Sequence, residues 1–120
     1  MATSITKFED AFKYSIIHES ACDNVAIENV TSEPGSIYSI SLTNPHQQDT
    51  AYFKFFDTAD VTMGTTVAEM VLKIPGASTY VYEMPTGVPF DSFSFACTKF
   101  QNPADNTAPS ATISVKIVTS

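Results

Sequence analysis

The chain has 120 residues, the usual size of one domain, and its nine Phe and five Tyr supply a core without help from a metal or a disulfide. Thirteen acidic residues outnumber six basic ones, all lysines, so the formal net charge is −7 and we expect neither nucleic acid nor an anionic membrane as a partner. No apolar run approaches the roughly 20 residues of a membrane span, and Met1 leads into a polar stretch, so we expect synthesis in the cytoplasm without a signal peptide.

The first 13 residues differ in pattern from the rest. Ile5, Phe8 and Phe12 recur at helical spacing, which is typical of a short helix over residues 4–13. An isolated helix of this length is marginal in water, so a short helix and an adaptable arm stay equally open. We therefore divide the chain into an N-terminal arm or helix, residues 1–13, and one sandwich domain, residues 14–120.

From residue 14 onward, apolar residues recur mostly at every second position, and Pro, Gly, Asn or Asp interrupts them about every eight to twelve residues. This pattern is typical of an all-β sandwich or barrel. Groups around Tyr14 to His18 and Val25 to Ile27 predict one or two strands. The remaining strands are expected at residues 36–43, 51–56, 67–74, 79–84, 91–100 and 111–118.

Together these segments predict seven or eight strands in an antiparallel β-sandwich of the jelly-roll or immunoglobulin-like kind. In the strand 36–43, Tyr38, Ile40 and Leu42 share one face and are expected to point inward. The strands 67–74 and 79–84 are expected to be neighbours.

The segment 51–56 is apolar on both faces, because Phe53 and Phe55 oppose Tyr52, Lys54 and Phe56. A strand of this kind is either central in its sheet or covered by a partner. Two later segments predict connections instead of strands. Pro85 to Pro89 is typical of a rigid connection, and Gln101 to Ser110 of an exposed loop.

Few residues suggest chemistry. His18, His46, Cys22 and Cys97 show no finger-like spacing, so we expect no metal and no other cofactor. Both cysteines lie in apolar, strand-like contexts, which favours two free, buried thiols over a disulfide. Cys97 also lacks a glycine elbow or a basic neighbour that would make it a nucleophile.

Carboxylates are the remaining candidates for catalysis. A pair of them would suit glycoside hydrolysis, but turns and outward strand positions are where solvated carboxylates normally lie. We therefore expect no catalytic residues and a protein that is not an enzyme. The carboxylates that the fold would have to bring together are Asp57, Asp60, Glu69, Glu83 and Asp91.

Four segments follow one another from residue 35 onward: GSIYSISLTN, AYFKFFDTADVTMGTT, MVLKIPGASTYVYEMPTGVPF and SFSFACTKFQNPADN. They contain a Tyr-x-Lys-x-Phe strand, an Asp-rich turn, a Met-Gly-Thr element, a Pro-Gly turn and a Pro-x-Gly-x-x-Phe turn. In this order they resemble a family of small bacteriophage structural proteins, over roughly residues 35–118. The chain departs from the family at Met63, where the family has Val, and in its N-terminal third.

The resemblance implies a β-sandwich component of a virion, with the major capsid protein or another virion protein as partner. We expect a decoration or cement protein on the capsid surface, which acts by burying surface on the shell; a dimer or trimer stays open. A tail, neck or fibre component is the first alternative, and a carbohydrate-binding module is the second. The interface candidates are Ile5, Phe8, Phe12, Phe53, Lys54 and Phe55.

Overall fold

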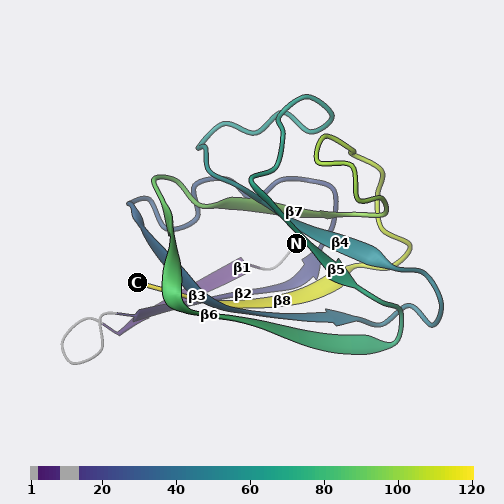
Figure 1. The fold of residues 1–120 in the computed structure, drawn as a ribbon, viewed down its shortest axis with the longest axis horizontal. Coiled ribbons are helices and arrows are strands. Elements are labelled where there is room, and N and C mark those ends of the chain that lie inside the picture. The colour runs from purple at the N-terminus through teal and green to yellow at the C-terminus, as the bar shows by residue number, and fades with distance from the viewer. Residues whose placement is uncertain (1–2, 9–13) are drawn as a thin grey trace.

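A computed structural model describes residues 3–8 and 14–120 of the chain. The described residues contain eight strands and no helix, so no helix among them could cross a membrane. The strands form two antiparallel sheets that pack as a sandwich (Figure 1). In chain order they are β1 (Thr3–Phe8), β2 (Tyr14–Cys22), β3 (Gly35–Asn44), β4 (Ala51–Phe56), β5 (Met70–Ile74), β6 (Ser78–Phe90), β7 (Ser94–Thr98) and β8 (Ile113–Thr119).

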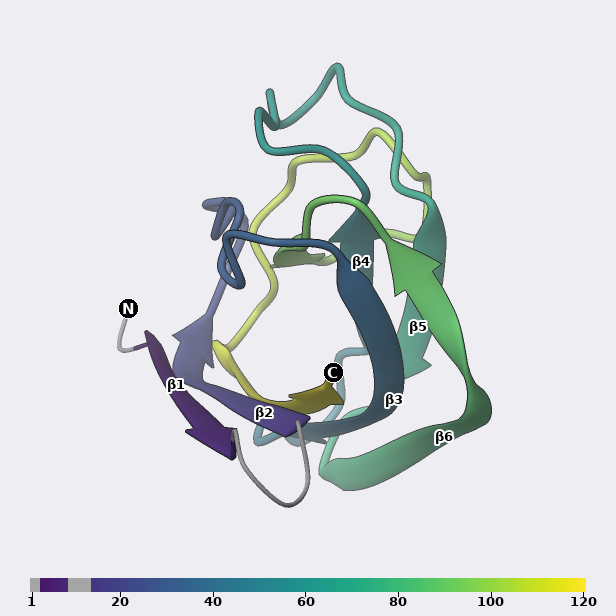
Figure 2. The same cartoon turned by 90° about the vertical axis from the view of Figure 1, so that its left-hand side faces the viewer.

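The larger sheet has five strands in the order β1-β2-β8-β3-β6, and the smaller one has three in the order β5-β4-β7. The chain passes from the five-stranded sheet to the three-stranded sheet after β3 and β6, and it returns after β5 and β7. Figure 2 shows both sheets curving around one interior. The expected all-β sandwich is thus confirmed, with eight strands.

The core lies between the sheets and is built by the period-two pattern. Ile17, Ile40 and Ile117 point inward from the five-stranded sheet and are fully buried. The three-stranded sheet contributes aromatic rings; Phe53 and Phe95, for example, stack with their centroids 5.6 Å apart. Burial of such large side chains is the main favourable term in folding.

The N-terminal segment forms a strand and not the helix that its spacing suggested. Thr3–Phe8 pairs antiparallel with β2, from Thr3 opposite Glu19 to Phe8 opposite Tyr14. Ile5 packs against the core from this edge. Pairing with β2 satisfies backbone groups and buries Ile5, whereas a lone short helix would gain neither.

Tyr38 is not on the inward face, contrary to expectation. The register between β3 and its neighbours shifts between Ile37 and Ser39, so Ile37 is fully buried instead. The Tyr38 ring lies edge-on to that of Tyr14, with the centroids 5.7 Å apart. A β-bulge of this kind reverses the alternation beyond it, and the sequence pattern alone does not reveal it.

The strand β6 corrects two expectations. It continues through Pro85 and Pro89, where a connection was predicted, because an edge strand tolerates residues that lack a backbone donor. Gly87 within it has a φ of +81°, and a side chain there would press on Tyr38. β6 also pairs with β3 and not with β5, so the two segments that were expected to be neighbours lie in different sheets.

The residues around Val25 do not form a named strand. Ile27 makes an isolated bridge with Phe95, with a pair of backbone hydrogen bonds of 2.9 and 3.0 Å. The Val30 amide also donates to the Phe93 carbonyl, at 2.9 Å. This segment therefore covers the edge of β7, which would otherwise offer unpaired backbone to another chain.

Candidate binding surfaces

The strand β4 is central in the three-stranded sheet, which is one of the two alternatives that its two apolar faces left open. Phe53 and Phe55 point into the core and are 0% and 2% exposed. These two interface candidates cannot contact a partner while the sandwich is folded. The strand is apolar on both sides because both of its faces are covered by the chain itself.

Lys54 lies on the opposite face of β4 and is fully buried as well, so it too is not an interface residue. Its ammonium group donates to the carbonyl of Asn102 at 2.5 Å and to that of Asp105 at 3.2 Å. Burial lowers the pKa of Lys54, and the Asp105 carboxylate opposes that shift. Lys54 therefore anchors the loop that follows β7.

Two loops, residues 57–69 and 99–112, together cover part of the outer face of the three-stranded sheet, and we call them the roof loops (Figure 1). They are tied to each other, since the Ala68 amide donates to the Pro103 carbonyl at 3.1 Å. The Asn24 side chain also donates to the Asn106 carbonyl at 2.8 Å. Under this cover Phe56 is buried.

The three remaining interface candidates, Ile5, Phe8 and Phe12, lie near the N-terminus, and the structure describes them only in part. Ile5 is half-buried against the core, which leaves little of it for a partner. Phe8 ends β1, but its side chain is not described, and Phe12 lies outside the described residues.

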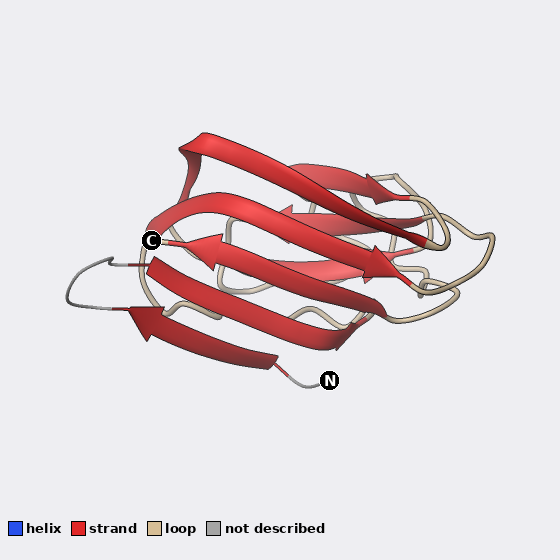
Figure 3. Cartoon of the chain, turned by 90° about the horizontal axis from the view of Figure 1, so that it is seen from below, coloured by secondary structure: helices blue, strands red, loops and turns tan. Residues whose placement is uncertain are grey.

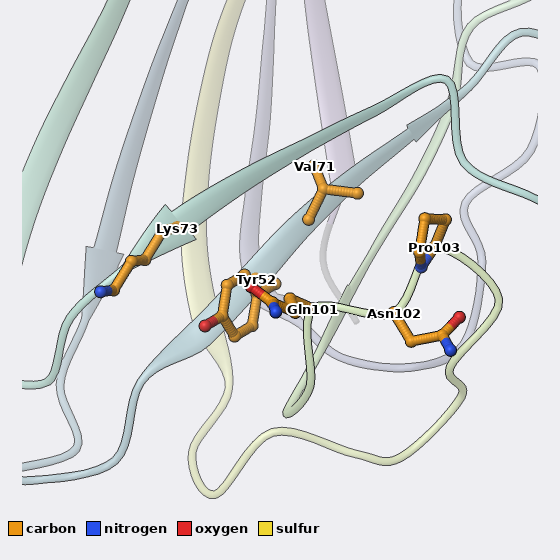
Figure 4. A pocket seen from close by; sticks show the side chains of 6 residues that line it. All are labelled: Tyr52, Val71, Lys73, Gln101, Asn102 and Pro103. Carbon is orange, nitrogen blue, oxygen red and sulfur yellow. The ribbon is translucent and has the colours of Figure 1, made fainter.

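Beside the roof loops, two adjoining spaces are lined in part by Tyr52, and we call them together the Tyr52 hollow; Figure 4 shows the lining of the first. It consists of two adjoining spaces of about 560 and 450 Å³, which share Tyr52 and Gln101. The first is lined by Tyr52, Val71, Lys73, Gln101, Asn102 and Pro103. The second is lined by Gln48, Asp49, Thr50, Tyr52, Lys99, Phe100 and Gln101.

The second space has a charged rim. The Asp49 carboxylate accepts a hydrogen bond of 2.5 Å from Ser110 and lies 4.0 Å from the Lys99 ammonium. The pKa of Asp49 is lowered, first by the Ser110 hydroxyl and then by His46 and Lys99. Asp49 thus stays ionised, and it partly neutralises Lys99.

The sequence indicated this region only coarsely. It predicted strand 51–56 and an exposed loop over residues 101–110, and the structure brings the two together. The aromatic residues of the hollow are the half-buried Tyr52 and the exposed Phe100, which were not among the interface candidates. Tyr52 could have been identified from the alternation of residues 51–56, because Tyr52 has to face away from Phe53 and Phe55.

A second surface is the outer face of the five-stranded sheet, which no described loop crosses (Figure 3). Strand register places its side chains in rows across the sheet. One row runs Thr6, Ile16, Val118, Ser39 and Glu83, and the next runs Ser4, His18, Lys116, Ser41 and Val81. We call these two rows the open face.

The open face has no excess of acidic residues. Its ionisable residues are His18, Lys116 and Glu83, and hydroxyl groups and aliphatic side chains make up the rest. Val81 is 57% exposed. The surface thus differs from the chain as a whole, whose net charge is −7.

The carboxylates considered for catalysis do not gather at one place. Asp57 and Asp91 share a small hollow of about 220 Å³ with Pro89 and Phe90. One oxygen of Asp57 already accepts from the backbone amides of Asp91 and Ser92, at 2.8 and 3.0 Å. Glu83 lies on the open face. Among the described residues, no group of three or more His, Cys, Asp or Glu could hold a metal ion.

Cys22 and Cys97 are free, buried thiols, as expected. They lie together in the core, where the Asp23 carbonyl accepts from the Cys97 amide at 2.8 Å and contacts the Cys22 sulfur at 3.9 Å. Burial raises the pKa of Cys22 well above its ordinary value, and the Cys97 thiol adds to this effect. The Cys22 thiol is thus held in the unreactive, protonated form.

Comparisons of the chain with protein-family models, with curated proteins and with solved structures found no match. Its function has therefore to be inferred from the described residues themselves.

Proposed function

We propose that the chain is a structural protein of a virus particle, a capsid decoration or cement protein that binds and stabilises the shell of major capsid protein. The observation that carries the proposal is the open face, an uncovered surface of the five-stranded sheet without an excess of acidic residues. Its contact would be made by surface burial and not by chemistry. The resemblance of residues 35–118 to small phage structural proteins supports the same role.

The size of the open face fits a protein partner. The whole outer face of the five-stranded sheet, of which the open face is part, has five strands about 4.8 Å apart and roughly 25 Å long, so it offers a surface on the order of 600 Å². A standard interface buries about 600–1,000 Å² on each side, so this face lies at the lower end of that range. The alternative partner for this face is a second copy of the chain, in a dimer or trimer.

The charge distribution supports the same use. The open face lacks the acidic excess of the rest of the chain, because it has one acidic residue, Glu83, and one lysine, Lys116, besides His18. Asp57, Asp60, Glu69 and Asp105 instead lie in the roof loops, on the far side of the sandwich. Docking through the open face would leave this acidic side toward solvent, where it keeps the particle surface hydrated.

The location can be tested on particles purified from the source of this chain. Immunogold electron microscopy with an antibody against the chain should label the shell evenly. Label at the tail, neck or fibres would contradict the capsid role and support the alternative role in that part of the virion. Absence of the chain from purified particles, measured by mass spectrometry, would overturn both. We further propose that the sandwich is of the jelly-roll or immunoglobulin-like kind.

The surface can be tested with a matched pair of variants. Val81→Glu puts a charge on the open face, whereas Val67→Glu puts the same charge on a roof loop at a similar exposure, 57% against 62%. We expect Val81→Glu to lower occupancy on particles by about tenfold or more and Val67→Glu to leave it unchanged. Equal effects of the two variants would show that the open face is not the contact.

A further inference from the structure

We propose that the Tyr52 hollow is a binding site for a short oligosaccharide that carries a carboxylate group. The site lies on the three-stranded sheet, opposite the open face, so it stands independently of the shell-binding proposal. If the chain binds the shell of a particle through the open face, this site points away from the shell.

The hollow has the size and rigidity of a ligand site. Its two spaces, about 560 and 450 Å³, fall within the roughly 300–1,000 Å³ usual for small-molecule sites. Its floor is the central strand β4, and its wall is the turn that Lys54 holds from below. The wall is also fixed internally, because the Ala104 amide donates to the Asn102 side chain at 2.9 Å. A preformed wall reduces the entropy lost on binding.

The side chains suit a sugar ring. A pyranose has an apolar face, which packs on an aromatic ring, and an edge of hydroxyl groups, which need both donors and acceptors. Tyr52 supplies the ring at the junction of the two spaces (Figure 4). The amides of Gln101 and Gln48 each carry a donor and an acceptor and lie at the rim.

The charges at the rim select an acidic sugar. Among the lysines whose side chains the structure describes, Lys73, Lys99 and Lys116 are exposed or half-exposed, and the first two line this hollow. Lys99 is partly neutralised by Asp49 at 4.0 Å. Lys73 lies opposite Tyr52 in the strand register and is therefore placed to pair with a carboxylate on a ring that packs on Tyr52.

A peptide is a poorer fit for the same hollow. Extended peptides gain most of their affinity by adding a strand to a free sheet edge. The hollow instead lies over the middle strand, where the backbone of β4 is already paired on both sides by β5 and β7.

The test is a nuclear magnetic resonance titration of the ¹⁵N-labelled chain with trigalacturonic acid and with sialyllactose, each against its methyl ester. We expect at least one of the two acids to shift the amide signals of residues around Tyr52 and Gln101, with a Kd of about 1 mM or tighter. The ester should bind at least about threefold more weakly, since it lacks the charge that Lys73 pairs with.

Variants then locate the site. Tyr52→Ala should weaken binding about tenfold, and Gln101→Ala, in an exposed loop where it leaves the fold intact, should weaken it measurably. Tyr80→Ala removes a tyrosine that is 43% exposed on the other sheet and should change nothing. Binding of neither acid, or shifts that Tyr52→Ala and Gln101→Ala leave unaltered, would overturn the site. An ester that binds as well as its acid would overturn the carboxylate specificity.

Discussion

At the residue scale, buried polar side chains in this sandwich serve to connect parts of the chain that the strands do not pair. Asn44 is an example, since its amide donates to the carbonyls of Asp49 and Ile74, at 2.9 and 3.1 Å, and accepts from the His46 amide at 3.1 Å. It thereby ties the end of β3 to the end of β5, in the other sheet. A buried donor or acceptor without a partner costs about 1–3 kcal/mol, so such side chains are hard to replace.

Tyr82 makes a similar connection at the sheet edges. Its hydroxyl donates to the Lys73 carbonyl at 2.6 Å and so links the edge strands β6 and β5. We expect Tyr82→Phe to lower the free energy of unfolding by about 1 kcal/mol. Tyr80→Phe is the matched control and should lie within about 0.5 kcal/mol of the parent protein in urea unfolding. A larger loss for Tyr80→Phe than for Tyr82→Phe would mean that the Tyr80 hydroxyl, and not the link between the edge strands, is the stabilising group.

The Cys22 thiol leads to a prediction for alkaline pH. Its pKa in the folded chain is raised above the ordinary value of 9.0. Below pH 9 the thiol is protonated in both states, so its contribution is fully present. As the pH rises further, the unfolded thiol ionises first, and folding loses stability.

Urea unfolding between pH 8 and pH 11 should therefore show a falling midpoint that Cys22→Ala makes less steep. Burial also raises the pKa of Tyr82 above 10.0, and Tyr82→Phe removes that part of the fall as a control. A Cys22→Ala profile parallel to that of the parent protein would contradict the shift.

At the element scale, most strands and the exposed loop 101–110 follow from the sequence, whereas the strand β1 does not. β4 was predicted with its true ends, because alternation and a change of composition mark both. β6 was predicted too short, since prolines usually end a strand, yet an edge strand does not need their missing donors. The three-stranded sheet was not recognised because its outer cover consists of the chain's own roof loops. A strand that is apolar on both faces looks the same whether a partner or a loop covers it.

Lys54 explains why the roof loop 99–112 holds its shape. Lys54→Met keeps the aliphatic stem but removes the donor to the carbonyls of Asn102 and Asp105. We expect the free energy of unfolding to fall by about 1–2 kcal/mol, and amide exchange in residues 99–107 to become faster than in the core. Lys116→Met, on the exposed open face, is the control and should change neither quantity. Unchanged exchange in Lys54→Met would mean that the loop is held by its contacts with the other roof loop.

At the scale of the whole molecule, the two sides of the sandwich differ in charge and in cover. The open face is uncovered and has no acidic excess, whereas the opposite side carries the roof loops with their carboxylates and the Tyr52 hollow (Figures 1 and 3). Such a molecule can bind a partner with one side and remain hydrated on the other. The net charge of −7 then has a separate role, which is to keep free copies apart before they dock.

This role of the net charge predicts how the free chain behaves in acid. At a pH near the isoelectric point of about 4.5 the mutual repulsion vanishes, so light scattering should report most self-association there and little at pH 7. Copies should associate through the open face, because it needs the least desolvation of charge. Val81→Lys places a cation in that face, whereas Val67→Lys adds the same charge to a roof loop, so both shift the isoelectric point alike. Only Val81→Lys should suppress the association at the new isoelectric point, and equal suppression by both would mean that net charge, and not the open face, controls it.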